Sequence, residues 1–410
     1  MNIIYLSHRV PFPADKGEKI RTYHQLEYLA KQGHSIAVFS PLETQKEQLF
    51  SDGLARALPV SVHCALLPSG LWRKGVSLMQ SKPVSVSHFY SRRLQQQIDA
   101  HLARQPVDAV VCTSSAMADY VFRSAELSAR SGRSRPRLIM DFMDLDSDKW
   151  HQYQQQSEGI MRWVYQRESH LLSGMEQRIY HAFDACLFIS ENEVDLFSIE
   201  LGERTKLHVS ANGLDTQSFY PPTKTIKKPR GPNLLFTGVM NYKPNEDAVL
   251  WFVKTQWPEV RARWPDARFV IAGMTPSNRV QALAEHDGIE VTGYVTDILP
   301  YYHRADVFIA PFRLARGVQN KILQAFACGV PVVTTGKGAE GIACQHNEHL
   351  LVGETPDAMI EAIDRLVNNA DLVQRLKNNA LSLVQQSYSW QGQLAGLGEL
   401  VRQSELQEAT

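Results

Sequence analysis

The chain alternates short runs of β-branched and apolar residues with longer segments of helical period, and it does so twice along its length. In the first half the runs predict strands at residues 2–6, 35–40, 61–67, 109–113, 138–140 and 186–189. The segments between them favour helices at residues 19–32, 92–104 and 150–181. This alternation is typical of parallel sheets covered by helices on both faces, so the sequence predicts an α/β fold.

The pattern restarts after the turn dipeptide Asn212-Gly213 and a Pro/Lys-rich stretch at residues 221–232, where we expect the inter-domain boundary. Strands are then predicted at residues 234–238, 268–272, 289–293, 306–310 and 331–335. Helices are predicted at residues 245–257, 279–286, 297–303, 317–327, 357–367 and 370–386. Two doubly wound halves imply an inter-domain cleft, with ligands at the carboxyl ends of the strands.

Charge and composition exclude several classes of protein. The chain carries 43 Lys and Arg against 43 Asp and Glu, which argues against a nucleic-acid partner. Its five cysteines are scattered and never spaced CxxC, as expected for reduced thiols in the cytosol. The N-terminus lacks the pattern of a cleavable signal, and no apolar run reaches the roughly 18 residues that span a membrane. We therefore expect a cytoplasmic protein.

The strongest candidate site is the loop and helix that follow the strand at residues 306–310. Arg313, Arg316 and Gly317 lie in the loop, and Lys321 and Gln324 share one face of the helix. Cations beside a helix N-terminus favour an anion such as a diphosphate, because the free N–H groups and the helix dipole attract negative charge. The alternative is a solvated basic loop with ordinary surface pairs.

This segment also carries a family resemblance. Gln324-Ala-Phe-Ala-Cys-Gly-Val-Pro-Val-Val333 resembles the nucleotide-sugar motif of family 4 glycosyltransferases of the GT-B fold. Further segments fall in the family's order, at Gly33-His34, Ser190-Glu191 and residues 212–215, 236–238 and 388–390. More narrowly, residues 11–21, 141–150, 240–245 and 313–321 resemble the sugar transferases of exosortase (PEP-CTERM) exopolysaccharide systems.

The resemblance implies two Rossmann-like domains: an acceptor-side domain at residues 1–208 and a donor domain at 209–386, with a terminal helix at 387–410 returning to the first. It implies a retaining transfer of a sugar from a nucleotide-diphosphate sugar to a saccharide acceptor, here a lipid-linked one, in exopolysaccharide biosynthesis. No metal or other cofactor is expected for the chemical step. The alternatives are a nucleotide-sugar epimerase on the same fold and a catalytically degenerate scaffold or binding subunit.

The sequence departs from the family at the donor motif, where Arg316 and Gln324 replace two glutamates. Arg316 cannot make the first glutamate's contact with the sugar, but together with Lys321 it could neutralise a leaving diphosphate. A glutamine can still accept a hydrogen bond from a ribose hydroxyl through its carbonyl, but without charge assistance. Gly238 is followed by Asn241 and Lys243 rather than by the usual Arg and Lys. We assign Gly238, Asn241 and Lys243 to donor binding, and the resemblance adds Glu340 beside the donor sugar.

The first domain contributes two more candidates. In the loop at residues 15–21, Lys19 and Arg21 begin a helix, where cations are unfavourable unless an anion offsets them; the alternative is a solvated cap. The loop resembles the family's glycine-rich loop, which implies that Lys16 and Gly17 bind the donor. After the strand at residues 138–140 come four acids, Asp141, Asp144, Asp146 and Asp148. They could bind a divalent cation or cap the next helix through Asp146 or Ser147. By resemblance, Asp144 would orient or deprotonate the acceptor.

Three remaining features are weaker. Residues 336–341 fit GxGxxG, but no helical period follows that a pyrophosphate could cap. His346 and His349 form HxxH without further ligands, which favours a surface loop over zinc. Residues 70–93 carry cations and no acid among aromatic residues, so they could dock peripherally on an anionic membrane or pack on the first sheet as an acceptor-side loop; the cations are Arg73, Lys74, Lys82, Arg92 and Arg93.

Overall fold

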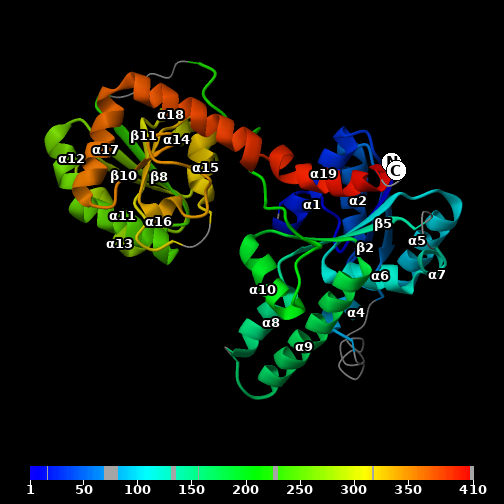
Figure 1. Cartoon of the computed structure of the whole chain (residues 1–410). Helices are drawn as coiled ribbons and strands as arrows, with labels where there is room; N and C mark the ends of the chain where they lie inside the picture. The colour runs from blue at the N-terminus through cyan, green and yellow to red at the C-terminus, as the bar shows by residue number, and fades with distance from the viewer. Residues whose placement is uncertain are drawn as a thin grey trace. The chain divides into compact units, whose positions relative to one another are not determined.

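The computed structural model describes residues 1–15, 17–68, 82–130, 135–155, 157–224, 230–315 and 318–406. The chain divides into two compact units (Figure 1). The first unit comprises Met1–Asn212 together with Gln393–Thr410, and the second comprises Gly213–Gly392. Among the helices of the described ranges, none is both long and apolar enough to cross a membrane.

The described residues of the first unit form a seven-stranded parallel sheet in the order β3-β2-β1-β4-β5-β6-β7. The strands are β1 (Asn2–Ser7), β2 (Ser35–Leu42), β3 (Ser61–Leu66), β4 (Ala109–Thr113), β5 (Arg137–Met143), β6 (Ala185–Phe188) and β7 (Leu207–Val209). All the predicted strands of this half are confirmed. The edge strand β7 was missed, because three residues are too few to show a period.

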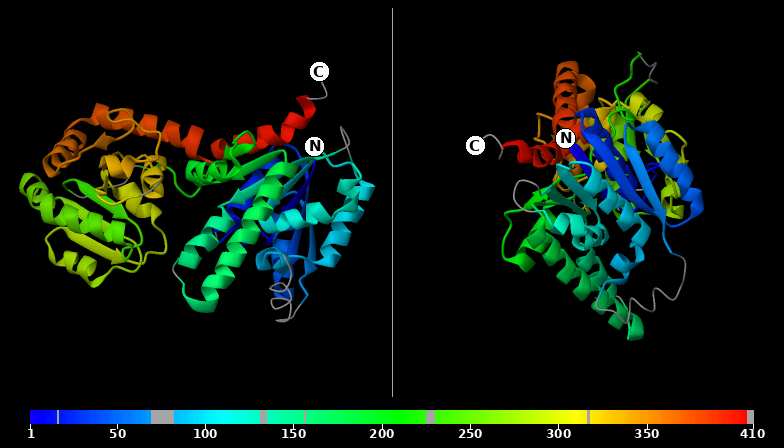
Figure 2. Two further views of the ribbon diagram at one scale, coloured as in Figure 1. Left: turned by 60° about the horizontal axis from the view of Figure 1, so that its bottom comes forward. Right: turned by 90° about the vertical axis from the view of Figure 1, so that its right-hand side faces the viewer.

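Helices cover both faces of this sheet (Figure 2). They are α1 (Gly17–Lys31), α2 (Gln48–Ala57), α4 (Val84–His88), α5 (Arg92–Arg104), α6 (Ala118–Arg123), α7 (Ala125–Ser128), α8 (Asp146–Gln155), α9 (Gly159–Ala182) and α10 (Glu191–Leu201). The prediction of one helix over residues 150–181 was wrong. The helix is interrupted between α8 and α9. The second helix begins at Gly159, whose φ of 61° is left-handed. The two helices then pack against each other as a hairpin.

The second unit repeats the plan with a six-stranded parallel sheet, in the order β10-β9-β8-β11-β12-β13. Its strands are β8 (Asn233–Thr237), β9 (Arg268–Ala272), β10 (Ile289–Gly293), β11 (Val307–Ala310), β12 (Val332–Thr334) and β13 (Leu351–Val352). The strands predicted for this half are confirmed, and only the two-residue β13 was missed. β8 and β11 are neighbours at the centre of this sheet and are buried along their whole length. Because the strands are parallel, their carboxyl ends lie at the same end of the sheet, where ligands of such folds bind.

The main helices of the second unit are α11 (Lys243–Thr255), α12 (Trp257–Arg263), α13 (Asn278–Gln281), α14 (Leu299–Arg304), α15 (Asn320–Ala327), α16 (Gly336–Ala339), α17 (Pro356–Asn368) and α18 (Ala370–Leu383). The last helix, α19 (Trp390–Leu406), begins in the second unit, and its residues from Gln393 onward belong to the first. There Gly398 packs so closely on Tyr28 of α1 that an added Cβ would lie 2.9 Å from the tyrosine oxygen.

Candidate functional site

A buried cation lies at the carboxyl end of the second sheet. Lys321, in the first turn of α15, donates from Nζ to Oδ1 of Asn245 at 2.5 Å. The ammonium lies 4.6 Å from the ring centroid of Phe236 and 5.0 Å from that of Phe312, in cation–π geometry. Burial lowers the pKa of Lys321 to about 7. Because no carboxylate of the described residues pairs with it, this site favours an incoming anion.

One glycine, Gly238, makes room for this cation. Gly238 directly follows β8, and an added Cβ there would lie 2.9 Å from Lys321 Nζ and 2.7 Å from Asn245 Nδ2. The φ of Gly238 is 154°. Asn245 Nδ2 donates to the Val239 carbonyl at 2.9 Å, so its Oδ1 is held toward Lys321. The sequence predicts Gly238 and Lys321 as two separate candidate residues, and the structure places them side by side. It adds Asn245, which sequence reasoning missed.

Gln324 lies one turn further along α15, with its carbonyl already engaged. Its Oε1 accepts from the hydroxyl of Tyr302 at 3.0 Å, and that hydroxyl also contacts Thr237 Oγ1 at 2.7 Å. Tyr302 is fully buried, and burial raises the pKa of its phenol. The Gln324 carbonyl, which we expect to receive a ribose hydroxyl, already accepts one hydrogen bond within the protein. A carbonyl oxygen has two lone pairs, so it can still accept a second hydrogen bond, and the amide nitrogen can donate to a ligand.

The other predicted donor residues are more exposed. Arg313 forms an ion pair with Asp247 of α11, with Nε–Oδ2 at 3.1 Å, so its guanidinium is not left unpaired for an anion. This ion pair raises the pKa of Arg313. Asn241 and Lys243 are exposed where the chain enters α11, and Glu340 is exposed and pairs with Lys337 at 2.8 Å. Lys16, Arg316 and Gly317 lie outside the described residues.

In the first unit, the cations at the start of α1 have partners within the chain. Arg21 is buried and donates twice to the buried Asp141 at the end of β5, from Nε at 2.7 Å and from Nη2 at 2.9 Å. Lys19 pairs with Asp15 at 3.4 Å. The expectation that a bound anion offsets these charges was therefore wrong for Arg21. Gly17 opens α1, and an added Cβ there would meet nothing within 4 Å.

The four acids after β5 divide into different roles. Asp141 belongs to the buried pair, whereas Asp144 is exposed just beyond the strand, after Met143 with a φ of 65°. The prediction that Asp146 or Ser147 precedes and caps the helix was wrong, because α8 begins at Asp146 and both residues lie inside its first turn. The amides of Leu145 and Ser147 donate to distant glutamates, Glu193 Oε2 at 2.7 Å and Glu176 Oε1 at 3.1 Å. The described ranges hold no cluster of three or more metal-ligating acids, histidines or cysteines.

The weaker motifs are explained by local structure. The GxGxxG segment forms only the four-residue α16, and the amide of Gly336 donates to Glu354 Oε1 at 2.9 Å. His346 and His349 accept backbone amides of Val352 and Gln345 through Nδ1, as residues of a structured turn do. Of the basic stretch at residues 70–93, Lys82 pairs with Asp119 at 3.4 Å, while Arg73 and Lys74 lie outside the described residues.

Known proteins of related sequence were found for both parts of the chain. Residues 231–369 match the family described as glycosyl transferases group 1. An uncharacterized 44.6 kDa protein from the cps region of Klebsiella pneumoniae is 22% identical over 94% of this chain and 96% of its own length. The GDP-mannose-dependent α-(1-6)-phosphatidylinositol monomannoside mannosyltransferase of Mycobacterium tuberculosis is 27% identical over 55% of this chain and 63% of its own.

Solved structures share the architecture of the whole chain. HepE of Anabaena in complex with UDP has a TM-score of 0.58 at 12% identity, and covers 98% of this chain and 100% of its own. The sucrose-phosphate synthase of Thermosynechococcus elongatus has a TM-score of 0.55 at 16% identity, with both chains covered completely. At such identities the likeness shows the fold alone, with its two sheets of parallel strands.

Proposed function

We propose that this chain, a glycosyltransferase of the GT-B fold whose residues 231–369 belong to the group 1 family, transfers a sugar from a nucleotide-diphosphate sugar to a saccharide acceptor. The observation that carries the proposal is the Lys321 ammonium, held on two aromatic rings and one amide oxygen at the carboxyl end of β8. HepE, of the same fold, binds UDP, which supports a nucleoside diphosphate as a ligand of this chain.

In the proposed mechanism, protonated Lys321 stabilises the negative charge that develops on the departing diphosphate. A cation already positioned in a partly dehydrated site does this well, because no solvent has to reorganise during bond cleavage. Gly238 lets the diphosphate approach the ammonium closely, and the Gln324 amide nitrogen can donate to the nucleotide. We propose Arg316, Asn241, Lys243 and Glu340 as further donor contacts and expect no metal in the chemical step.

The acceptor side of the proposal rests on the first unit. Exposed Asp144 follows β5, at the carboxyl edge where ligands of such sheets bind, and we propose that it orients or deprotonates the attacking hydroxyl. Retention of configuration and a lipid-linked acceptor in exopolysaccharide assembly are parts of the same proposal. The mannosyltransferase of Mycobacterium tuberculosis acts on a phosphatidylinositol monomannoside, which supports an acceptor of this class.

Donor selection tests the function directly. In a thermal-shift panel of UDP-, GDP- and dTDP-sugars, we expect one nucleotide class to raise the unfolding temperature, because a ligand of the folded state stabilises it. The same donor should then be hydrolysed slowly or transferred, with release of the nucleoside diphosphate, in the presence of EDTA. Conversion of the sugar with the nucleotide retained would instead indicate an epimerase. Binding without turnover would indicate a scaffold, and neither result fits a transferase.

Peripheral membrane attachment is a separate part of the proposal. A lipid-linked acceptor requires the enzyme to reach a membrane, and residues 70–93 carry Arg73 and Lys74 without a neighbouring acid. We expect the protein to co-sediment with liposomes that contain anionic lipid and not with neutral ones. Arg73→Gln together with Lys74→Gln should abolish this binding. If the unaltered protein stays in the supernatant with both kinds of liposome, the attachment through this segment is refuted.

A further inference from the structure

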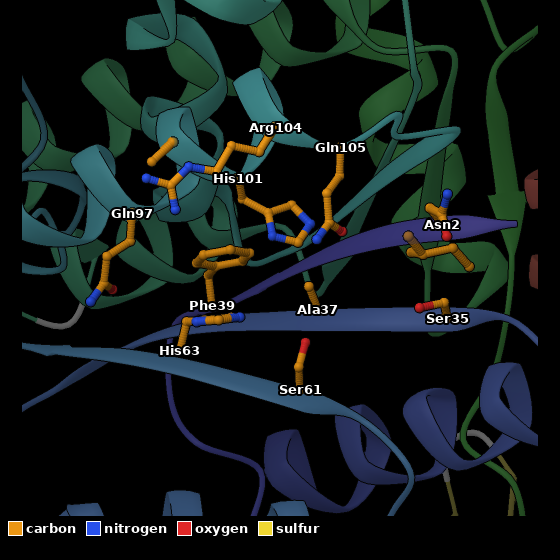
Figure 3. Close-up of a pocket in the computed structure, with 12 residues that line it drawn as sticks. Asn2, Ser35, Ala37, Phe39, Ser61, His63, Gln97, His101, Arg104 and Gln105 are labelled. Carbon is orange, nitrogen blue, oxygen red and sulfur yellow. The ribbon is translucent and has the colours of Figure 1, made fainter.

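A cavity of about 570 Å³ lies in the first unit, between α5 and the amino-terminal halves of β1, β2 and β3 (Figure 3). Its volume falls within the range of roughly 300–1,000 Å³ that is usual for small-molecule sites. Asn2, Ser35 and Ser61 mark the amino ends of the three strands at this pocket. Because Asp144 follows the carboxyl end of β5, a ligand here would bind at the opposite edge of the sheet.

Aromatic rings form the centre of the pocket. The ring of Phe39 stacks on His63 with centroids 4.7 Å apart and an interplanar angle of 18°. His101 of α5 meets Phe39 edge-on at 5.5 Å and lies 6.0 Å from His63. Burial lowers the pKa of both imidazoles. At neutral pH each ring therefore offers one N–H donor and one acceptor to a ligand.

The charge of the pocket has one sign. Arg104 lies one turn after His101 on α5, and Figure 3 shows both side chains on the side of Phe39 away from His63. The described residues that line the pocket include no Asp or Glu, and no carboxylate of the described chain pairs with Arg104. Asp108 is bonded to Asn2 at this end of the sheet, where its Oδ2 accepts from the Asn2 amide at 2.6 Å, but it does not line the pocket. A guanidinium in this setting suits a phosphate, which it can contact through two N–H groups.

The pocket also presents groups for hydroxyls. Gln97 Oε1 is buried and has no hydrogen-bond donor among the described residues, while its Nε2 lies 3.5 Å from the Cys64 carbonyl. An unpaired buried acceptor gains from a ligand O–H, which Gln97 Oε1 receives when the side chain turns toward the pocket. Ser35 and the Gln105 amide also line the pocket; in Figure 3 both lie on the side of His101 that is away from Gln97. The lining thus combines one exposed, permanently charged guanidinium with several neutral donors and acceptors.

We propose that this pocket binds the monophosphate of a small polyhydroxylated molecule, such as a sugar phosphate. Arg104 and His101 contact the phosphate, and Gln97 accepts from a hydroxyl. The site is separate from the Lys321 site, since its residues belong to the first unit and Lys321 to the second. It does not depend on the proposed transferase function.

The proposal is tested by NMR of the full chain with labelled histidine, in which His63→Asn and His101→Asn assign the two ring signals. Glucose 6-phosphate should shift both signals saturably, with a dissociation constant below about 1 mM. Glucose at the same concentrations should leave them in place. Inorganic phosphate should act more weakly, because it makes no hydroxyl contact.

Two variants make the test specific. Arg104→Gln should weaken binding at least about tenfold, the effect expected when a charge-assisted contact is lost. Arg92→Gln, the same change at an exposed residue of α5 outside the pocket, should not alter it. Gln97→Leu should also weaken binding, and it keeps the test valid should Arg104→Gln fail to fold. Unmoved His63 and His101 signals, or equal responses to glucose and its phosphate, would overturn the proposal.

Discussion

Lys321→Met is expected to lower donor turnover by about 10²–10³-fold, the loss seen when one preorganised stabilising contact to a developing negative charge is removed. The ammonium is the buried cation nearest Gly238, and it has no carboxylate partner among the described residues. Methionine keeps the length and apolar contact of the side chain against Phe236 and Phe312. Because a buried charge is removed rather than orphaned, we expect the variant to fold at least as stably as the wild type.

The same residue predicts a pH dependence of binding. The pKa of Lys321 is lowered to about 7 in the free protein, and a bound diphosphate favours the charged form and raises it again. Binding above pH 7 therefore takes up a proton, so the dissociation constant of the nucleoside diphosphate should rise by up to about tenfold for each pH unit. Calorimetric titrations in buffers of different ionisation enthalpy measure the proton uptake.

The free energy of unfolding, in contrast to the affinity for the diphosphate, should increase as the pH rises. Between about pH 7 and 10.5 the unfolded chain binds a proton at Lys321 that the folded chain does not, so this group makes folding more favourable as pH rises. Urea unfolding of Lys321→Met should lack that increment. Lys254→Met, at an exposed position of α11, is the matched control and should behave as the wild type.

Unchanged diphosphate affinity in Lys321→Met would show that the donor site lies elsewhere.

Strands could be predicted better than helix limits, for a physical reason. A buried parallel strand such as β4 or β11 is a short, continuous apolar run bounded by polar residues, and this signal is local. The break between α8 and α9 depends instead on the left-handed backbone of Gly159 and on the packing of one helix against the other. A helical period continues across such a break, so the sequence alone favours one long helix.

The candidate site shows the same division. Lys321 could be predicted because it follows a buried strand and a loop on one short segment of chain. Arg21 was misinterpreted because its partner Asp141 stands 120 positions away, and a charge without a visible neighbour looks free for a ligand. Tyr302 was missed for the same reason, since its contact with Gln324 joins α14 to α15. Pairings between distant segments are set by the sheet order and not by any local pattern.

Asp141→Ala is expected to destabilise the first unit by about 3–5 kcal/mol, because it leaves the Arg21 guanidinium buried without a counter-ion. Arg21 is 1% exposed and Asp141 0%. Asp141 also accepts from Gln25 Nε2 at 2.7 Å, and Gln25 in turn accepts from the hydroxyl of Tyr5, so further buried groups lose their partners. Urea unfolding followed by circular dichroism measures the loss.

A double variant measures how much of this loss comes from the unpaired Arg21 charge. Arg21→Met with Asp141→Leu removes both charges, so it should recover the part of the stability that Asp141→Ala loses through the buried guanidinium, since a buried pair roughly balances its own desolvation. The part lost because Gln25 Nε2 has no acceptor should remain. Arg135→Met, which breaks a half-exposed pair with Asp184 in the same unit, should cost about 1 kcal/mol or less. If Asp141→Ala costs no more stability than Arg135→Met, the Arg21 guanidinium must be solvated in the folded protein. The ion pair of Arg21 with Asp141 would then not be a buried pair that stabilises the first unit.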